Sequence, residues 1–208
     1  MELRPTTAQE AGKEDGRPVT ICVFSGAAST VPPSLMETAH ATGRLIGERG
    51  HQLVYGGGGL GLMGEVAWTA SKHGAPVIGV IPKFLYEREL GIAAPLQESK
   101  ITETLHDRKM KMMELADAFL ALPGGYGTLD EVLDAISAQY LGLSDKPLVL
   151  LNTGNVWDGF VTLIDTLTDI GLITSRERPM FDVAFSPQEA MELIEARVTH
   201  AKTAQSAA

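Results

Sequence analysis

The sequence has little of several features that common classes of protein require. It contains one cysteine among 208 residues, so neither a disulfide framework nor a cysteine-based zinc site can be built from it. Its 17 Lys and Arg residues are outnumbered by 26 Asp and Glu. The resulting formal net charge of −9 argues against a duplex-binding surface, which needs a basic face. No apolar run approaches the length needed to cross a bilayer.

Several sequence motifs are also absent, and each absence excludes a class of protein. Residues 1–17 carry no long apolar segment of the kind that a secretion signal needs, and we expect a cytoplasmic protein. The five histidines have no metal-ligand spacing, and no G-x-S-x-G nucleophile motif occurs. Cys22 lies inside the apolar run VTICVF, where a buried and inert thiol is expected. The 44% hydrophobic and 21% charged residues are ordinary for a globular protein.

Short apolar runs alternate with helical patterns, and this order predicts a single domain over residues 18–198. Residues 1–17 and 199–208 are polar and lack periodicity, so we expect disordered tails there. Near-continuous apolar strands alternating with helices are typical of an α/β fold with a mainly parallel sheet and helices on both faces. The expected strands are 19–24, 52–55, 76–81, 118–122 and 147–151, with a weaker candidate at 98–104. The expected helices are 33–49, 61–73, 105–116, 128–141, 156–170 and 187–197.

Three loops that follow expected strands are unusual: SGAAST at 25–30, GGGGLGLMG at 56–64 and PGGYGT at 123–128. Ligands of parallel sheets bind at the carboxyl ends of the strands, where these loops lie. The second loop contains G-x-G-x-x-G, but it follows the second strand and lacks an acid about 20 residues on, which argues against nicotinamide or flavin. Glycines let backbone N–H groups approach a phosphate, although a tight turn without a ligand is the alternative. Two such turns in one sheet favour a site for the phosphate and sugar of a nucleotide.

Glu131 follows the third loop and allows two interpretations. Thr128 and Glu131 have the T-x-x-E spacing of a capping box, whose side chains bond to backbone N–H groups at the start of a helix. The same type of spacing occurs at 34–37 and 186–189, where no chemistry is expected. Of the three glutamates, only Glu131 lies beside a glycine loop at the carboxyl end of a strand. This position makes it a candidate for catalysis as well as for capping.

The segment LHDRKMKMMELA, which begins at Leu105, places an arginine in an apolar stripe. On a helix, Arg108 shares a face with Leu105, Met112 and Leu115. An arginine in such a position either points at an anion or lies at the rim of the core with its charge in water. We expect the neighbouring Lys109 to be solvated or to face a phosphate.

Together these motifs resemble the LOG family, the cytokinin-activating nucleoside 5′-monophosphate phosphoribohydrolases that were long mislabelled as lysine decarboxylases. The resemblance covers about residues 19–175, and its motifs stand in the family's order. They are VYGGGGLGLMG, VIGVIPKFL, ERELG, HDRKMKM and PGGYGTLDE. The combination of PGG-x-GT-x-x-E with an upstream R-K is highly specific.

The resemblance implies a Rossmann-like doubly wound sheet and hydrolysis of the N-glycosidic bond of N6-modified AMP to a free base and ribose 5-phosphate. It also implies a homodimer that uses no cofactor or metal. Arg108 and Glu131 would be the catalytic pair. The residues that would contact the nucleotide are Ser25, Gly26, Gly57, Gly58, Glu89, Lys109, Gly124, Gly125, Tyr126, Gly127 and Thr128.

The sequence also departs from the family pattern. The first loop begins SGAA where the family usually has C-G-S-S, which removes two hydroxyl groups and leaves Ser29 as the candidate substitute. Residues 87–89 read ERE where the family often has P-R-E, and Leu105 stands where methionine is common. These departures affect the expected contacts to the base more than the expected reaction.

Other functions remain open from the sequence. An AMP nucleosidase without a hormone role would share every motif. A non-catalytic nucleotide sensor or carrier would keep the glycine loops but would need neither Arg108 nor Glu131. Lysine decarboxylation normally needs a cofactor-bearing lysine, and no lysine here has a distinguishing context. Two glycine loops, which are costly in chain entropy, argue against a purely structural protein.

Overall fold

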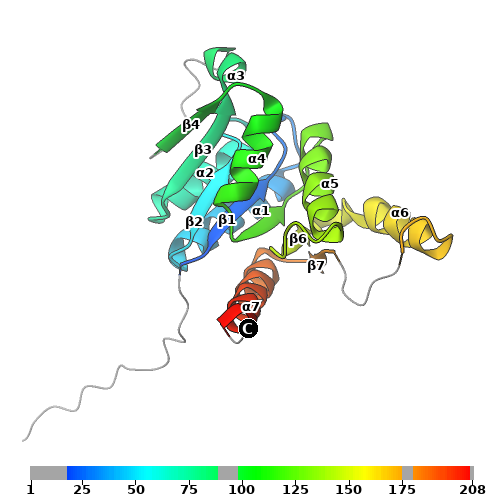
Figure 1. Ribbon diagram of the computed structural model, residues 1–208. Helices are drawn as coiled ribbons and strands as arrows, with labels where there is room; N and C mark the ends of the chain where they lie inside the picture. Colours follow the sequence, from blue (N-terminus) through cyan, green and yellow to red (C-terminus); the bar gives the residue numbers. More distant parts are fainter. Residues whose placement is uncertain (1–17, 89–97, 175–179, 207–208) are drawn as a thin grey trace, which may run out of the picture.

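The computed structural model describes residues 18–88, 98–174 and 180–206, and within them seven parallel strands form one sheet (Figure 1). The strand order is β4-β3-β2-β1-β5-β6-β7. The strands are β1 (Thr20–Phe24), β2 (Gln52–Tyr55), β3 (Val77–Pro82), β4 (Glu98–Thr102), β5 (Ala118–Ala121), β6 (Leu148–Leu151) and β7 (Asp182–Ala184). The helices are α1 (Pro33–Glu48), α2 (Gly61–Lys72), α3 (Lys83–Arg88), α4 (Leu105–Leu115), α5 (Tyr126–Tyr140), the 3₁₀ turn η1 (Thr153–Asn155), α6 (Asp158–Asp169) and α7 (Pro187–Ser206).

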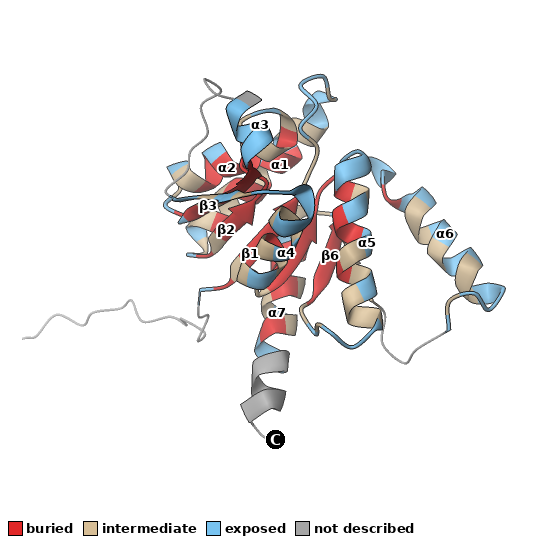
Figure 2. Ribbon diagram, turned by 45° about the horizontal axis from the view of Figure 1, so that its top comes forward, coloured by how far each residue is buried: buried red, intermediate tan, exposed pale blue. Residues whose placement is uncertain are grey.

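The five inner strands of the sheet (β1, β2, β3, β5 and β6) are buried on both faces because their residues enter two separate cores (Figure 2). Ile21 and Val23 of β1 face the core that α1, α2 and α7 complete. Cys22 and Phe24 face the core that α4 and α5 complete, where Phe24 stacks on Phe119 with ring centroids 5.6 Å apart. The predicted doubly wound α/β class is therefore confirmed.

The predicted strands with continuous apolar runs are all present, and the weaker candidate is the edge strand β4. Three short elements were not predicted: α3, η1 and β7. β7 has only three residues, Asp182–Ala184, too few for a periodic pattern to appear. No helix within the described ranges is both long and apolar enough to span a membrane.

The start of α5 differs from the prediction. The helix begins at Tyr126 with Gly125 as its N-cap, two residues earlier than expected, and no side chain caps it. Thr128 therefore lies in the first turn and Glu131 in the second, so the capping-box interpretation of this pair is wrong. The carboxylate of Glu131 is left available for other contacts.

Of the other two predicted capping boxes, the one at 34–37 is absent and the one at 186–189 is only half formed. The N-cap of α1 is Pro32, without a side-chain hydrogen bond, so the box at 34–37 is wrong. At α7, the Ser186 hydroxyl accepts the Glu189 N–H, but the Glu189 carboxylate accepts the N–H of Phe185 instead of completing the box. α7 continues to Ser206, so the backbone of 199–206 is helical where a tail was expected. The expected tail at 1–17 and residues 207–208 lie outside the described residues.

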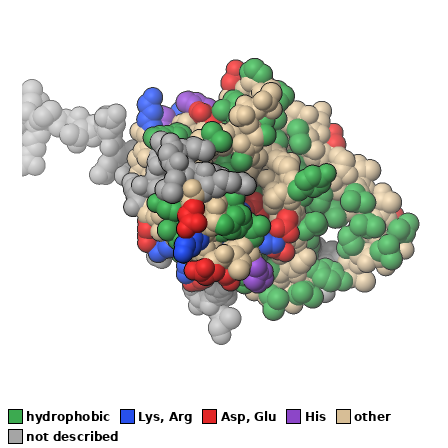
Figure 3. All heavy atoms as spheres, turned by 90° about the horizontal axis from the view of Figure 1, so that it is seen from above, with side chains coloured by type: hydrophobic (Ala, Val, Ile, Leu, Met, Phe, Trp, Pro, Cys, Tyr) green, Lys and Arg blue, Asp and Glu red, His purple; other side chains and the backbone are tan. Residues whose placement is uncertain are grey.

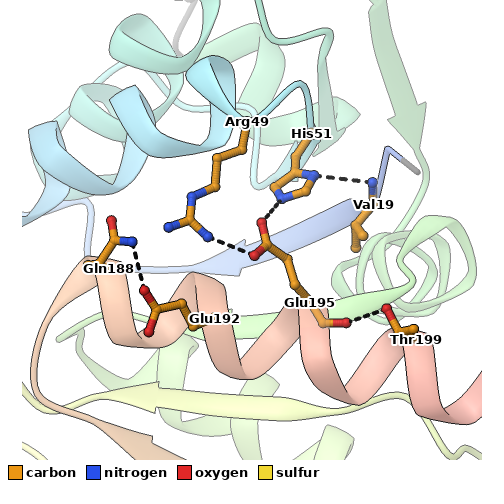
Figure 4. A network of polar contacts seen from close by, with 7 residues as sticks. All are labelled: Val19, Arg49, His51, Gln188, Glu192, Glu195 and Thr199. Carbon is orange, nitrogen blue, oxygen red and sulfur yellow. Dashed lines mark hydrogen bonds and ion pairs between the residues drawn. The ribbon is translucent and has the colours of Figure 1, made fainter. Parts of the chain in front are cut away.

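A network of hydrogen bonds and ion pairs connects α7 to the amino ends of β1 and β2 (Figure 4). The buried His51 accepts the Val19 N–H at Nδ1 over 3.3 Å, so its proton lies on Nε2. That Nε2 donates to Glu195 Oε1 at 2.9 Å, and Arg49 Nη1 donates to Glu195 Oε2 at 2.7 Å. One carboxylate on α7 thus holds two residues that lie between α1 and β2.

Replacing Glu195 by Gln should lower the free energy of unfolding by about 1 kcal/mol, because the amide cannot accept from both Arg49 and His51. Urea unfolding followed by circular dichroism measures this change. Glu192→Gln is the matched control, since Glu192 is exposed on the same helix and, among the described residues, accepts from Gln188 alone. Equal stability of the two variants would contradict this role of the network.

Candidate active site

The three unusual loops meet at the carboxyl ends of neighbouring strands. β1 lies between β2 and β5, so its loop is flanked by the second and third glycine loops. The Gly26 N–H donates to the Pro123 carbonyl at 3.2 Å, and the Met63 N–H donates to the Gly26 carbonyl at 3.1 Å. α1 and α5 leave this point toward opposite faces of the sheet. It is the switch point at which ligands of such sheets bind.

Packing explains two glycines of the G-x-G-x-x-G segment without a ligand. Gly61 has φ +60°, and a Cβ there would lie 2.6 Å from the carbonyl carbon of Ala27. A Cβ on Gly64 would lie 2.3 Å from the Gly59 carbonyl oxygen. Gly61 lets the first and second loops pack backbone against backbone, and Gly64 lets α2 approach Gly59 within the second loop.

Arg108 and Glu131 are brought together from different helices. Arg108 Nη1 of α4 lies 3.3 Å from Glu131 Oε1 of α5. Their side chains are only 15% and 7% exposed. Arg108 Nε donates to the carbonyl of Val80, near the carboxyl end of β3, at 3.1 Å. Both residues of the predicted catalytic pair therefore share one ion pair at the edge of the sheet where the loops meet.

Glu131 has a perturbed acidity. Burial raises the pKa of its carboxyl to about 7, and the nearby charges of Asp130 and Asp134 raise it as well. Arg108 and Lys109 act in the opposite direction and lower the pKa. A carboxyl that titrates near neutral pH can be either ionised or protonated under working conditions, and such groups are typical of catalytic sites.

The third loop forms the start of α5. The buried Thr128 packs back against Gly124, where a Cβ would lie 2.0 Å from the threonine Oγ1. A Cβ on Gly125 or Gly127 would meet no atom within 4 Å, so open space adjoins these two positions. The first N–H groups of a helix have no partner within it and favour an anion. Tyr126 is 93% exposed.

The remaining predicted contacts lie in varied surroundings. Ser25 follows β1, and its Oγ is buried without a hydrogen-bond partner among the described residues. Gly57 and Gly58 are buried after β2. Lys109 turns toward α5, where its ammonium contacts Asp130 and Asp134. Glu89 lies outside the described residues.

Two features that position Arg108 were missed by the sequence analysis. Gly56 leaves room for the guanidinium, because a Cβ there would lie 2.0 Å from Arg108 Nη2 and 2.8 Å from Met63 Sδ. Thr104 and Asp107 form a reciprocal capping box at the start of α4. The T-x-x-D spacing was the available signal for this cap, which fixes the helix one residue before Arg108.

Comparisons with known proteins show the family to which this chain belongs. A family model described as "Possible lysine decarboxylase" matches residues 63–194. A cytokinin riboside 5′-monophosphate phosphoribohydrolase of Oryza sativa subsp. japonica is 41% identical over 183 residues, which cover 88% of this chain and 74% of that protein. The chain belongs to this family. A relative of the same name from Mycobacterium marinum is 44% identical over 161 residues, covering 76% of this chain and 85% of that protein.

Solved structures of less similar proteins share the fold of this chain. The molybdenum cofactor carrier protein of Chlamydomonas reinhardtii matches with a TM-score of 0.67 and 24% identity, covering 88% of this chain and 99% of that chain. The molybdenum cofactor binding protein of Rippkaea orientalis matches with a TM-score of 0.64 and 24% identity, covering 86% and 97%. At this identity the likeness concerns the fold alone. Within the described ranges, no group of His, Cys, Asp and Glu side chains is arranged to hold a metal ion.

Replacing Gly56 by Ala should push the Arg108 guanidinium away from Glu131, because the added methyl would overlap Nη2. The pKa of Glu131 should then rise by about one unit above its starting value, since Arg108 normally lowers it. Carbon-13 NMR of carboxyl-labelled glutamate measures the midpoint, with the Glu131 signal assigned by its loss in Glu131→Gln.

Gly159→Ala on α6 is the matched control, since an added Cβ there meets nothing within 4 Å. An unchanged midpoint in Gly56→Ala would contradict the role assigned to this glycine.

Proposed function

We propose that the protein hydrolyses the N-glycosidic bond of N6-modified adenosine 5′-monophosphates, releasing the free base and ribose 5-phosphate. The observation that carries the proposal is the buried Arg108–Glu131 pair beside the point where the first loop meets the two glycine loops. The names of relatives about 40% identical over most of the chain support the same reaction. A carrier or sensor would need the loops but not a buried, near-neutral carboxyl.

The 5′-phosphate would bind at the start of α5. Gly125 and Gly127 adjoin open space, and the first N–H groups of the helix are available as donors. The buried Ser25 hydroxyl at the neighbouring loop is a further donor without a partner among the described residues. Binding energy at the phosphate would orient the glycosidic bond, which is the part that reacts.

Glu131 would act on the ribose. As the bond between C1′ and the base nitrogen breaks, positive charge develops on the sugar, as in other glycoside hydrolyses. The ionised carboxylate of Glu131 would stabilise that charge and orient or deprotonate the water whose oxygen adds to C1′. The electron pair of the broken bond leaves with the purine, which takes up a proton.

Arg108 can serve either of two negative groups. Its planar guanidinium donates through Nε to Val80 and through Nη1 to Glu131, and its Nη2 lies against Gly56. A substrate in this corner would present either its 5′-phosphate or its departing base to the guanidinium. Both roles place the same positive charge opposite a group that is anionic in the transition state.

We also propose a homodimer that forms through α6. No residue of this helix is buried by the rest of the described chain (Figure 2). Hydrophobic side chains gather on the side of the molecule that carries α6 (Figure 3). On this helix and in the turn that follows it, Leu163, Ile170 and Leu172 are each at least half exposed. The apolar side of α6 is only partly covered, where Phe160 packs against Trp157 and Phe181, and an amphipathic helix that is covered only in part is typical of an interface. A second copy offers the same face and would cover it.

The first test is a product assay. Purified protein should release isopentenyladenine from N6-isopentenyl-AMP faster than it releases adenine from AMP, as measured by chromatography of bases and nucleotides. Glu131→Gln should abolish turnover while nucleotide binding persists, because the amide cannot carry the negative charge. Glu37→Gln, at an exposed glutamate with the same local spacing, should retain wild-type rates.

Each contrary result of the assay has a definite meaning. Faster release of adenine would favour an AMP nucleosidase. If neither base appears but either nucleotide raises the melting temperature, the protein is a sensor or carrier. Turnover by Glu131→Gln at the wild-type rate would overturn the mechanism.

The proposed dimer predicts the effect of a charge on α6. Leu163→Lys should convert the dimer to a monomer, because burying an unpaired ammonium at an apolar interface is costly. Light scattering after size-exclusion chromatography measures the mass. Thr162→Lys adds the same charge to the polar side of the helix and should leave the dimer intact. A wild-type monomer, or a dimeric Leu163→Lys variant, would contradict this interface.

A further inference from the structure

A second set of charges joins α4 to α5 beside the proposed catalytic pair. Lys109 Nζ lies 2.7 Å from Asp130 Oδ2 and 2.5 Å from Asp134 Oδ2. The side chain of Lys109 is only 15% exposed, whereas Asp130 is exposed and Asp134 is half-buried. Among the described residues, these two contacts and the Arg108–Glu131 pair are the ion pairs between the helices. Two consecutive cations of α4 therefore meet three carboxylates of α5.

The acidic residues on the surface of α5 require a cation beside them. Asp130 and Asp134 are four residues apart, so they are neighbours on the helix surface, where like charges repel. Glu131, next to Asp130, is a third acid in the same two turns. The ammonium of Lys109 lies against both aspartates and offsets their repulsion. Burial would lower the pKa of Lys109, but the hydrogen bonds to Asp130 and Asp134 outweigh burial and raise it, so the ammonium stays charged.

We propose that Lys109, Asp130 and Asp134 form a charge clamp that holds α4 against α5 and so fixes Arg108 relative to Glu131. They are positioning residues. In place of the nucleotide contact that the family resemblance implies for Lys109, we assign it an action on the reaction through the two aspartates. This inference rests on the proposed function, because the geometry that the clamp fixes is that of the hydrolytic pair. It also assigns roles to Asp130 and Asp134, which no motif singled out.

The clamp has an electrostatic consequence that a purely mechanical contact would not have. Lys109 lowers the pKa of Glu131, whereas Asp130 and Asp134 raise it. The other charged neighbour is Arg108, which lowers the pKa, and the thiol of Cys22 on β1 is kept neutral because burial raises its own pKa. Removing the lysine and removing an aspartate must therefore move the titration of Glu131 in opposite directions.

The test compares Lys109→Met, Asp134→Asn, the double variant and Lys109→Arg in the full chain. Lys111→Met is the matched control, since Lys111 lies two residues away and pairs only with Glu114 of its own helix in the described structure. Steady-state cleavage of N6-isopentenyl-AMP and AMP gives kcat and KM. Carbon-13 NMR of carboxyl-labelled glutamate gives the titration midpoint of Glu131 in the free protein.

Lys109→Met should lower kcat on the order of tenfold to a hundredfold, because a displacement of about 1 Å at the pair is costly, with KM nearly unchanged. Its Glu131 midpoint should rise, and that of Asp134→Asn should fall. The double variant should lose less than the sum of the single losses, since the residues act as one unit. Lys109→Arg should recover most of kcat, and Lys111→Met should match the wild type.

A large rise in KM with unchanged kcat in Lys109→Met would show a substrate contact and overturn the clamp. Midpoints that move in the same direction, or not at all, would also overturn it. If the wild-type protein cleaves neither nucleotide, the proposed function fails, while the NMR titration still decides whether the clamp controls Glu131. The two failures are therefore distinguishable.

Discussion

The ion pair between Arg108 and Glu131 is the interaction on which the rest of the site depends. Two charges with so little exposure to water lose solvation, and their attraction repays that loss only when the geometry is well held. The fold supplies this geometry from several elements. The Val80 carbonyl accepts from the guanidinium, Gly56 leaves room for it, and the cap formed by Thr104 and Asp107 fixes the start of α4.

The burial of Glu131 also gives the protein a stability cost that depends on pH, and Arg108 reduces this cost. In the unfolded chain Glu131 has its ordinary pKa of 4.5, and in the folded chain its pKa is about 7. The folded state therefore binds the proton more tightly, so stability falls as the pH rises from about 4.5 through 7. The loss from this residue alone is at most about 3 kcal/mol above that range. The ionised state that the proposed chemistry needs is thus the less stable one.

Much of the fold could be predicted because the central strands are continuous apolar runs between glycine-rich turns. The apolar stripe around Arg108 left open whether its charge points at an anion or lies in water, and the structure places it against Glu131. The start of α5 was mispredicted because Thr128 and Glu131 mimic a capping box, whereas the helix begins at Tyr126. The need for Gly56 could not be read locally, since its reason is a side chain on α4. Long-range contacts of this kind appear only once the strand order is known.

The parallel sheet separates the stabilising contacts from the costly ones. The His51–Glu195 network lies at the amino ends of β1 and β2, whereas Arg108 and Glu131 lie near the carboxyl ends of the strands. Contacts at one end can therefore offset the cost of a buried charge pair at the other without touching the substrate. Because buried strands join the two ends, a well-anchored α7 supports a site whose own charges oppose folding. Because the stabilising contacts and the site lie at opposite ends of the sheet, the fold can tolerate the buried charges of Arg108 and Glu131.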